Sequence, residues 1–235
     1  MKHNSPLIKI LEIVANMLIV SFFWTLCSIP IVTIIPASSA LYHTMNKKIF
    51  DGRGNGVVKD FFNSFKLNFV QGFKVNIICI IAVGFIVIGL NTAFQIYTLN
   101  IFGLLYLILS FLITFVFAIM LVFLPPVISK FYLKVIDYIK LSVFLSFQNI
   151  FLSILNVLLL VLFVFIVRII PIAIVITPAL YVGLVSGSIK KRMQKFIDDN
   201  NLNEEVLYEE KSLETTNDVS FYDIDKNLSK TRKSK

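Results

Sequence analysis

Long apolar runs alternate with short basic segments along this chain. No Asp, Glu, Lys or Arg occurs between residues 13 and 46 or between 75 and 129, and Arg168 is the one charged residue between 141 and 189. A membrane-spanning helix needs about 20 apolar residues. The pattern predicts an all-α, polytopic transmembrane helical bundle with about five spans, over about residues 14–35, 75–96, 102–125, 141–167 and 169–189.

The first apolar run is too long for one straight span, and two prolines interrupt it. Because proline removes a backbone donor and kinks or ends a helix, we expect helix breaks at Pro30 and Pro36, with a second helical piece beginning near Pro36. The small residues at 37–40 let helices approach closely in a bilayer. A broken helix at membrane depth marks a binding site in some proteins and is an ordinary kink in others, and both interpretations stay open.

The first polar segment, residues 46–74, holds a glycine-rich turn and then an amphipathic pattern. From Val58 onward, phenylalanines recur at helical spacing, with lysines and amides off the stripe. We expect this helix to lie on the membrane surface, and docking of a partner protein is the alternative. The candidate partner or membrane-surface face is Phe62, Phe65, Lys66, Phe69 and Phe73.

A second polar segment, residues 129–142, has the same character, and Pro125-Pro126 is expected to end the span before it. The fragment Pro36-Ala37 leading to Ala40-Leu41-Tyr42 is echoed by Pro178-Ala179-Leu180-Tyr181, although these matches are too short to establish an internal repeat. Residues 1–195 are therefore predicted to form a transmembrane helical domain, and residues 196–235 a cytoplasmic, mostly disordered tail.

The basic residues predict the orientation of the chain. They concentrate in segments 47–74, 130–140 and 190–195, which the positive-inside rule places in the cytoplasm together with the C-terminus. Five spans then put the N-terminus outside. In the alternative, Pro30 to Pro36 form a re-entrant hairpin and the N-terminus is cytoplasmic. Arg168 is expected at the turn between the last two spans, because a charge at the bilayer centre costs about 2.5–3.5 kcal/mol.

Composition agrees with a membrane protein. Hydrophobic residues make up 57% of the chain and charged residues 15%, and the mean hydropathy is +0.84. Soluble domains are about 25% charged. The net charge of +8 lies mostly beside apolar runs, where topology and anionic lipid headgroups account for it, so we expect the lipid bilayer and no nucleic acid as a partner.

The sequence carries no recognisable catalytic or metal-binding motif. Cys27 and Cys79 are expected to be buried free thiols, and His3 and His43 are isolated. We therefore predict no enzymatic activity, no catalytic or metal-ligating residue and no cofactor.

A resemblance to a known family rests on several short stretches. These are the region of Trp24, Ser28-Ile29-Pro30-Ile31-Val32-Thr33, Pro36-Ala37-Ser38-Ser39-Ala40-Leu41-Tyr42, Asp60-Phe61-Phe62, Phe65-Lys66-Leu67-Asn68-Phe69 and Phe123-Leu124-Pro125. Through them, residues 8–190 resemble the YesL family of bacterial membrane proteins, a domain of unknown function; Ile35 replaces a glycine common in that family. The resemblance implies the bacterial plasma membrane and association with ABC-type carbohydrate uptake systems, and it implies no catalytic residues.

Two functions follow as expectations. The first is an accessory or regulatory component associated with carbohydrate uptake, with ABC sugar-transporter subunits as partners. The second is an autonomous facilitator or transporter of sugars or other small solutes, because Asn, Gln, Ser and aromatic side chains suffice to line a sugar path.

Overall fold

In a computed structural model, the described residues are 6–50, 56–98 and 100–199. Within these ranges the chain is helical and contains no strand, which confirms the predicted all-α class. The elements are α1 (Pro6–Ser28), η1 (Ile31–Thr33), α2 (Ile34–Thr44), the π-helix η2 (Met45–Phe50), α3 (Val57–Ile96), α4 (Ile101–Lys130), α5 (Val135–Gln148), α6 (Ile150–Ile169), η3 (Pro171–Val175) and α7 (Thr177–Asp199).

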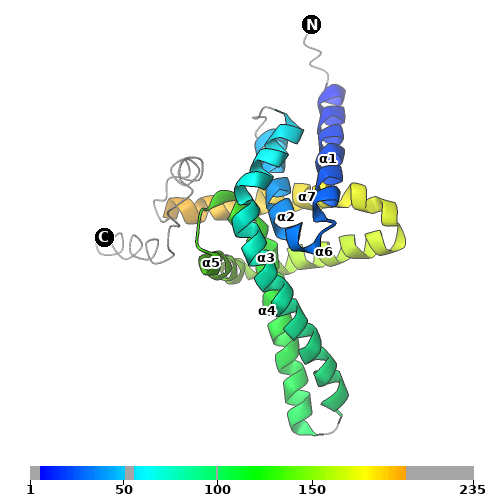
Figure 1. The fold of residues 1–235 in the computed structure, drawn as a ribbon, viewed down its shortest axis with the longest axis vertical. Helices are drawn as coiled ribbons and strands as arrows, with labels where there is room; N and C mark the ends of the chain where they lie inside the picture. Colours follow the sequence, from blue (N-terminus) through cyan, green and yellow to red (C-terminus); the bar gives the residue numbers. More distant parts are fainter. Residues whose placement is uncertain (1–5, 51–55, 99, 200–235) are drawn as a thin grey trace, which may run out of the picture.

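Helices α1 and α2 form an antiparallel hairpin that turns at Pro30. Helix α1 ends at Ser28, and Pro30 has an extended backbone, with φ −72° and ψ 117°. Pro36 does not break a helix but lies in the first turn of α2, where its missing N–H is tolerated. The start of α1, the end of α2 and the start of α3 lie at one end of the molecule (Figure 1). The predicted continuous span over 14–35 is therefore corrected to a hairpin.

Helix α3 is one continuous helix of 40 residues. The predicted division into a surface helix over 58–74 and a span over 75–96 is wrong, because no proline or turn sequence separates the two halves. Gly72 sits at the close contact with α2: a Cβ at this position would lie 3.1 Å from Pro36. At about 1.5 Å per residue, α3 is about 60 Å long.

The second half of α3 pairs with α4 in a hairpin that projects from the rest of the chain, and we call this hairpin the arm (Figure 1). Asn100 caps α4 by accepting a hydrogen bond from the Gly103 N–H at 2.9 Å. The apolar side chains of the arm are widely exposed, including Phe85, Phe102 and Leu105. Helix α4 continues through Pro125 and Pro126 to Lys130, so the prediction that these prolines end the helix is wrong.

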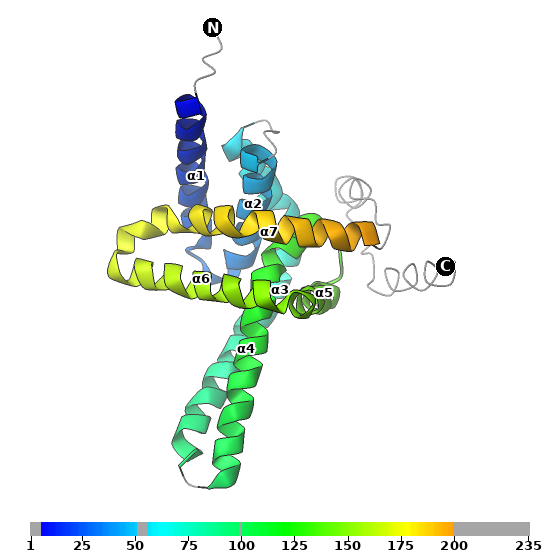
Figure 2. The same cartoon turned by 180° about the vertical axis from the view of Figure 1, so that it is seen from behind.

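Helices α6 and α7 form a second hairpin that crosses α3 and α4, and both views show this crossing (Figures 1 and 2). Arg168 is exposed in the last turn of α6, beside the turn at η3, as expected. Helix α7 extends to Asp199 and buries Phe196 and Ile197, so the first four residues of the predicted tail, 196–199, are helical. Residues 200–235 lie outside the described residues.

The core surrounds α2. Ala37 and Ala40 are fully buried, as is Ser39, and α2 contacts α1, α3, α4 and α7. Small side chains permit this crowding because they let neighbouring backbones approach. The large buried side chains of the core come mainly from α4, which contacts α2, and from α5, which packs on α4. Phe123, Ile128 and Leu141 are among them.

Candidate functional site

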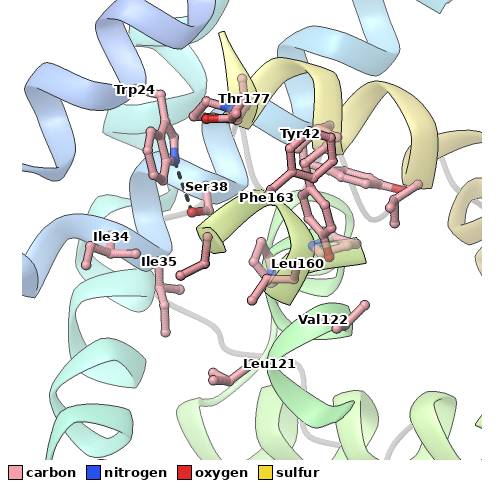
Figure 3. Close-up of a pocket in the computed structure, with 18 of the residues that line it drawn as sticks. Trp24, Ile34, Ile35, Ser38, Tyr42, Leu121, Val122, Leu160, Phe163 and Thr177 are labelled. Atoms are coloured by element: carbon pink, nitrogen blue, oxygen red, sulfur yellow. Dashed lines mark hydrogen bonds between the residues drawn. The ribbon is translucent and has the colours of Figure 1, made fainter. Parts of the chain in front are cut away.

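A cleft of about 420 Å³ lies between the α1–α2 hairpin, α4 and the α6–α7 hairpin. Its volume falls in the range of about 300–1,000 Å³ that is typical of ligand pockets. Most of its lining is aliphatic or aromatic, and α6 supplies Leu160, Phe163 and Val164. Figure 3 shows Leu160 and Phe163 converging with labelled side chains of α1, α2, α4 and α7, which are far apart in sequence. We call this site the apolar cleft.

The few polar groups of the apolar cleft come from α1, α2 and α7. The Trp24 indole N–H donates to the Ser38 hydroxyl at 3.1 Å, across the α1–α2 hairpin. The Thr177 hydroxyl donates to the Ala173 carbonyl at 2.8 Å. In Figure 3, Trp24, Thr177 and Tyr42 lie along one side of the cleft and Leu121 and Val122 along the other, so the few polar groups of this largely apolar site lie along one side.

Two hydroxyl protons in the apolar cleft have no protein acceptor in the part of the chain that the structure describes. Tyr181 packs edge-on against Phe163, with ring centroids 6.1 Å apart, and its hydroxyl makes no hydrogen bond there. The Ser38 hydroxyl accepts from Trp24 and donates to no described group. Both could donate to a ligand oxygen.

A buried polar network holds α7 against α2 and η2 beside the cleft. The Tyr42 hydroxyl donates to the Ser186 carbonyl at 3.3 Å, and the Ser186 hydroxyl donates to Asn46 Oδ1 at 2.5 Å. The Asn46 amide in turn donates to the Tyr42 carbonyl at 3.0 Å. Because buried polar groups are costly unless paired, this network favours one register of α7 on α2.

Helix α4 contributes the segment that holds its two prolines. Leu121, Val122, Pro125 and Pro126 all line the apolar cleft. Because proline has no N–H, the carbonyls of Leu121 and Val122 lack their usual helical donors. The prolines predicted to end a span therefore form one wall of the cleft.

The predicted helix breaks lie next to the apolar cleft and outside its lining. Pro30 is exposed at the hairpin turn, and Pro36 is buried against Gly72. The residues after the break supply the lining, including Ile34, Ile35 and Ser38. The structure thus brings the break to a candidate binding site without giving either proline a contact there.

The two similar sequence fragments, 36–42 and 178–181, meet in the cleft, since Tyr42 and Tyr181 both line it. Sequence reasoning noted these tyrosines only as part of a repeat. It gave no role to Leu160 or Phe163 on α6, which no local pattern distinguishes from lipid-facing residues.

The predicted phenylalanine face forms a ladder of rings along the first half of α3. Phe65 and Phe69 lie 5.4 Å apart and Phe69 and Phe73 5.9 Å apart, measured between ring centroids. Phe62 packs against Phe23 of α1 at 5.1 Å. The rings are half-buried apart from Phe69, which is exposed with its neighbour Lys66. The helix therefore packs against α1 and leaves its outer edge exposed.

Charged groups lie near the start of α3 and along the end of α7. Asp60, in the first turn of α3, is 4% exposed, and its Oδ1 lies 3.5 Å from Lys47 Nζ. An acidic group at this position also favours the helix N-terminus. On α7, Phe196 directly follows the basic exit segment 190–195 and packs against Phe131 and against Phe144 of α5.

These features define the class of the protein. Four helices in the described part of the chain are long and apolar enough to cross a membrane: Leu11–Ser28 of α1, Val57–Ile96, Ile101–Lys130 and Ile150–Ile169. The chain is thus an all-α polytopic membrane protein. The fifth predicted span, 169–189, is divided between η3 and α7.

The comparison with protein families adds a match over part of the chain. Residues 13–90 match the family described as protein of unknown function, DUF624. The match covers most of α1, all of α2 and most of α3, including the α1–α2 hairpin and the phenylalanine ladder. No curated protein and no solved structure shows a significant match to the chain.

Proposed function

We propose that this protein is an accessory or regulatory membrane subunit of an ABC-type carbohydrate uptake system in the bacterial plasma membrane. The resemblance to the YesL family supports the association with uptake systems, and the match to DUF624 covers residues 16–73, where most of that resemblance lies. That the chain belongs to the YesL family is part of the proposal. No catalytic step is included.

The observation that carries the proposal is the length of α3. Its 40 residues extend about 60 Å, twice the roughly 30 Å thickness of the hydrocarbon core of a bilayer. Residues 75–96 are the uncharged half and pair with α4. If they cross the bilayer, the first half of α3 extends beyond it on the side that carries Lys47, Lys59 and Lys66.

If the bilayer surrounds residues 75–96, an apolar surface of the protein lies outside the hydrocarbon core. Helix α1 lies beside the first half of α3, with Phe23 against Phe61 and Phe62. It therefore lies outside a hydrocarbon core that surrounds residues 75–96. Its side chains Leu11, Phe22 and Leu26 are 67%, 49% and 47% exposed. Large exposed apolar patches mark interaction sites. Together with the outer edge of the phenylalanine ladder, this surface is the proposed docking face.

The positive-inside rule orients the proposed arrangement. The start of α3 with its lysines faces the cytoplasm, and the basic end of α7 and the C-terminus do as well. The start of α1 lies at the same end as the start of α3 (Figure 1), so the N-terminus is proposed to be cytoplasmic. This replaces the expectation of an external N-terminus from five spans.

The alternative, an autonomous facilitator, has less support. A sugar path offers hydrogen-bond partners along its length, whereas the apolar cleft has only a few polar groups, mainly on the side of Trp24 and Tyr42. Liposomes that contain the purified protein alone would take up labelled sugar if the alternative were correct.

Site-specific photo-crosslinking in native membranes tests the docking face. We expect p-benzoylphenylalanine at Phe69 or Lys66 to capture a subunit of a sugar ABC transporter. The matched control is the same probe at Leu158 of α6, which is 61% exposed and lies outside the proposed face. Equal capture from all three positions, or recovery of no transport component together with unchanged sugar uptake after deletion, would contradict the proposal.

A further inference from the structure

We propose that the apolar cleft holds an acyl chain of a membrane glycerophospholipid, whose ester carbonyl accepts a hydrogen bond from the Tyr181 hydroxyl. This inference goes beyond the proposed docking function and concerns a different surface. It shares with that function only the placement of the bilayer around residues 75–96.

The lining fits a hydrocarbon chain. The cleft of about 420 Å³ is walled by aliphatic and aromatic side chains from α1, α2, α4, α6, η3 and α7. An apolar cavity stays dry and takes an apolar occupant. Leu160 is 41% exposed and Val164 61% exposed, so the α6 wall continues into the exposed apolar surface of that helix. The cleft therefore opens toward a surface suited to lipid.

The unpartnered hydroxyls indicate an occupant with an oxygen acceptor. Tyr181 and Ser38 each present a hydroxyl proton that no described group accepts, although both lie among apolar side chains. A pure hydrocarbon would leave both unsatisfied. A fatty ester combines an apolar chain with a carbonyl oxygen, which matches a largely apolar cleft whose few polar groups lie along one side (Figure 3).

The depth of the cleft also fits an ester group. Pro36 of α2 packs against Gly72, and the Ile31 carbonyl accepts a hydrogen bond from the Asn76 amide at 2.8 Å. These contacts place the α1–α2 turn at the edge of the uncharged run that starts at residue 75. Phospholipid esters lie at this edge of the hydrocarbon core, between the chains and the headgroups.

The test uses the purified full chain in nanodiscs that contain phosphatidylglycerol with a diazirine at the end of one acyl chain. After illumination, mass spectrometry locates the lipid adducts. We expect them to concentrate on cleft residues of α4 and α6. Leu160→Trp fills the cleft and should remove most of these adducts. Leu158→Trp makes the same change outside the cleft lining, at a position 61% exposed, and should leave them unchanged.

Tyr181→Phe keeps the packing and removes one hydroxyl. We expect it to lower cleft labelling about fivefold, as the loss of one hydrogen bond would, while the thermal midpoint of unfolding stays unchanged. This variant keeps the test decisive if Leu160→Trp does not fold. Adducts spread over α3, α4 and α6 in proportion to exposure would overturn the proposal. So would unchanged labelling in Tyr181→Phe, or a co-purified polypeptide crosslinked in the cleft. None of these outcomes depends on a transporter subunit.

Discussion

Single residues decide how closely the helices of the arm approach each other. A Cβ added to Gly103 would collide with the Ile96 carbonyl, whereas one added to Gly84 would meet nothing within 4 Å. Both glycines lie in uncharged helical sequence, and only the contact distinguishes them. Gly103 is thus required by the tight connection of α3 to α4, and Gly84 is not.

Gly103→Ala should therefore destabilise the protein. Because the neighbour is backbone and must shift, the expected cost is about 1–3 kcal/mol, as for other overpacked sites. Gly84→Ala is the matched control, and it should be neutral or stabilising by up to about 1 kcal/mol, because alanine favours a helix interior. Denaturant titration in detergent, followed by circular dichroism, measures both. Equal stability of the two variants would contradict the assigned contact.

At the scale of elements, the α1–α2 hairpin shapes the molecule. In one straight helix, Trp24 and Ser38 would lie about 21 Å apart, at about 1.5 Å per residue. In the hairpin their side chains are joined by a hydrogen bond of 3.1 Å. The reversal at Pro30 thus brings α2 to the centre of the core and opens the apolar cleft beside it.

Cysteine crosslinking distinguishes the hairpin from a continuous span. In a background with Cys27→Ala and Cys79→Ala, the pair Trp24→Cys and Ser38→Cys should form an intrachain crosslink with a short bis-maleimide. The reason is that the hairpin holds the two side chains in contact. Protease cleavage between the two positions, followed by mass spectrometry, detects the link.

Leu11→Cys paired with Ser38→Cys is the control, because Leu11 lies near the far end of α1 and is 67% exposed. This pair should remain unlinked. A Trp24–Ser38 pair that reacts no faster than the control would indicate a continuous span through Pro30.

At the scale of the whole molecule, α3 connects two unlike regions. Its first half packs with α1 and α2, and its second half forms the arm with α4 (Figure 1). A single layer of about 30 Å perpendicular to α3 encloses one region or the other. We propose that the bilayer surrounds the arm, because residues 75–129 form the longest uncharged run of the chain.

This placement predicts that the two ends of α3 lie on opposite sides of the membrane. In the same cysteine-free background, Thr98→Cys should react with a membrane-impermeant maleimide added to intact cells. Val58→Cys, which is also exposed, should react only after permeabilisation. Labelling of both positions from the outside would contradict a crossing by residues 75–96.

Much of the fold could be predicted from sequence, because its signals are local. Charge-free runs of more than 20 residues predicted long helices that can cross a membrane, although five spans were expected and the described residues contain four such helices. Pro30 was expected to break a helix, and the reversal of the chain there was only the alternative to a span over 14–35. Errors occurred where neighbours decided the outcome. Residues 58–74 were expected to form a separate surface helix, yet the close packing of Gly72 against Pro36 lets α3 continue past α2 without a break. Pro125 and Pro126 were expected to end α4, yet the helix continues.

The sequence by itself thus determined the class of the protein, since apolar length and the position of charge depend only on the order of residues. The tertiary structure alone decided the site. Trp24, Ser38, Leu160 and Tyr181 come from four helices, and their convergence in one cleft depends on the angles at which those helices cross. Such angles arise from packing between residues far apart in the chain, which no periodicity along the sequence records.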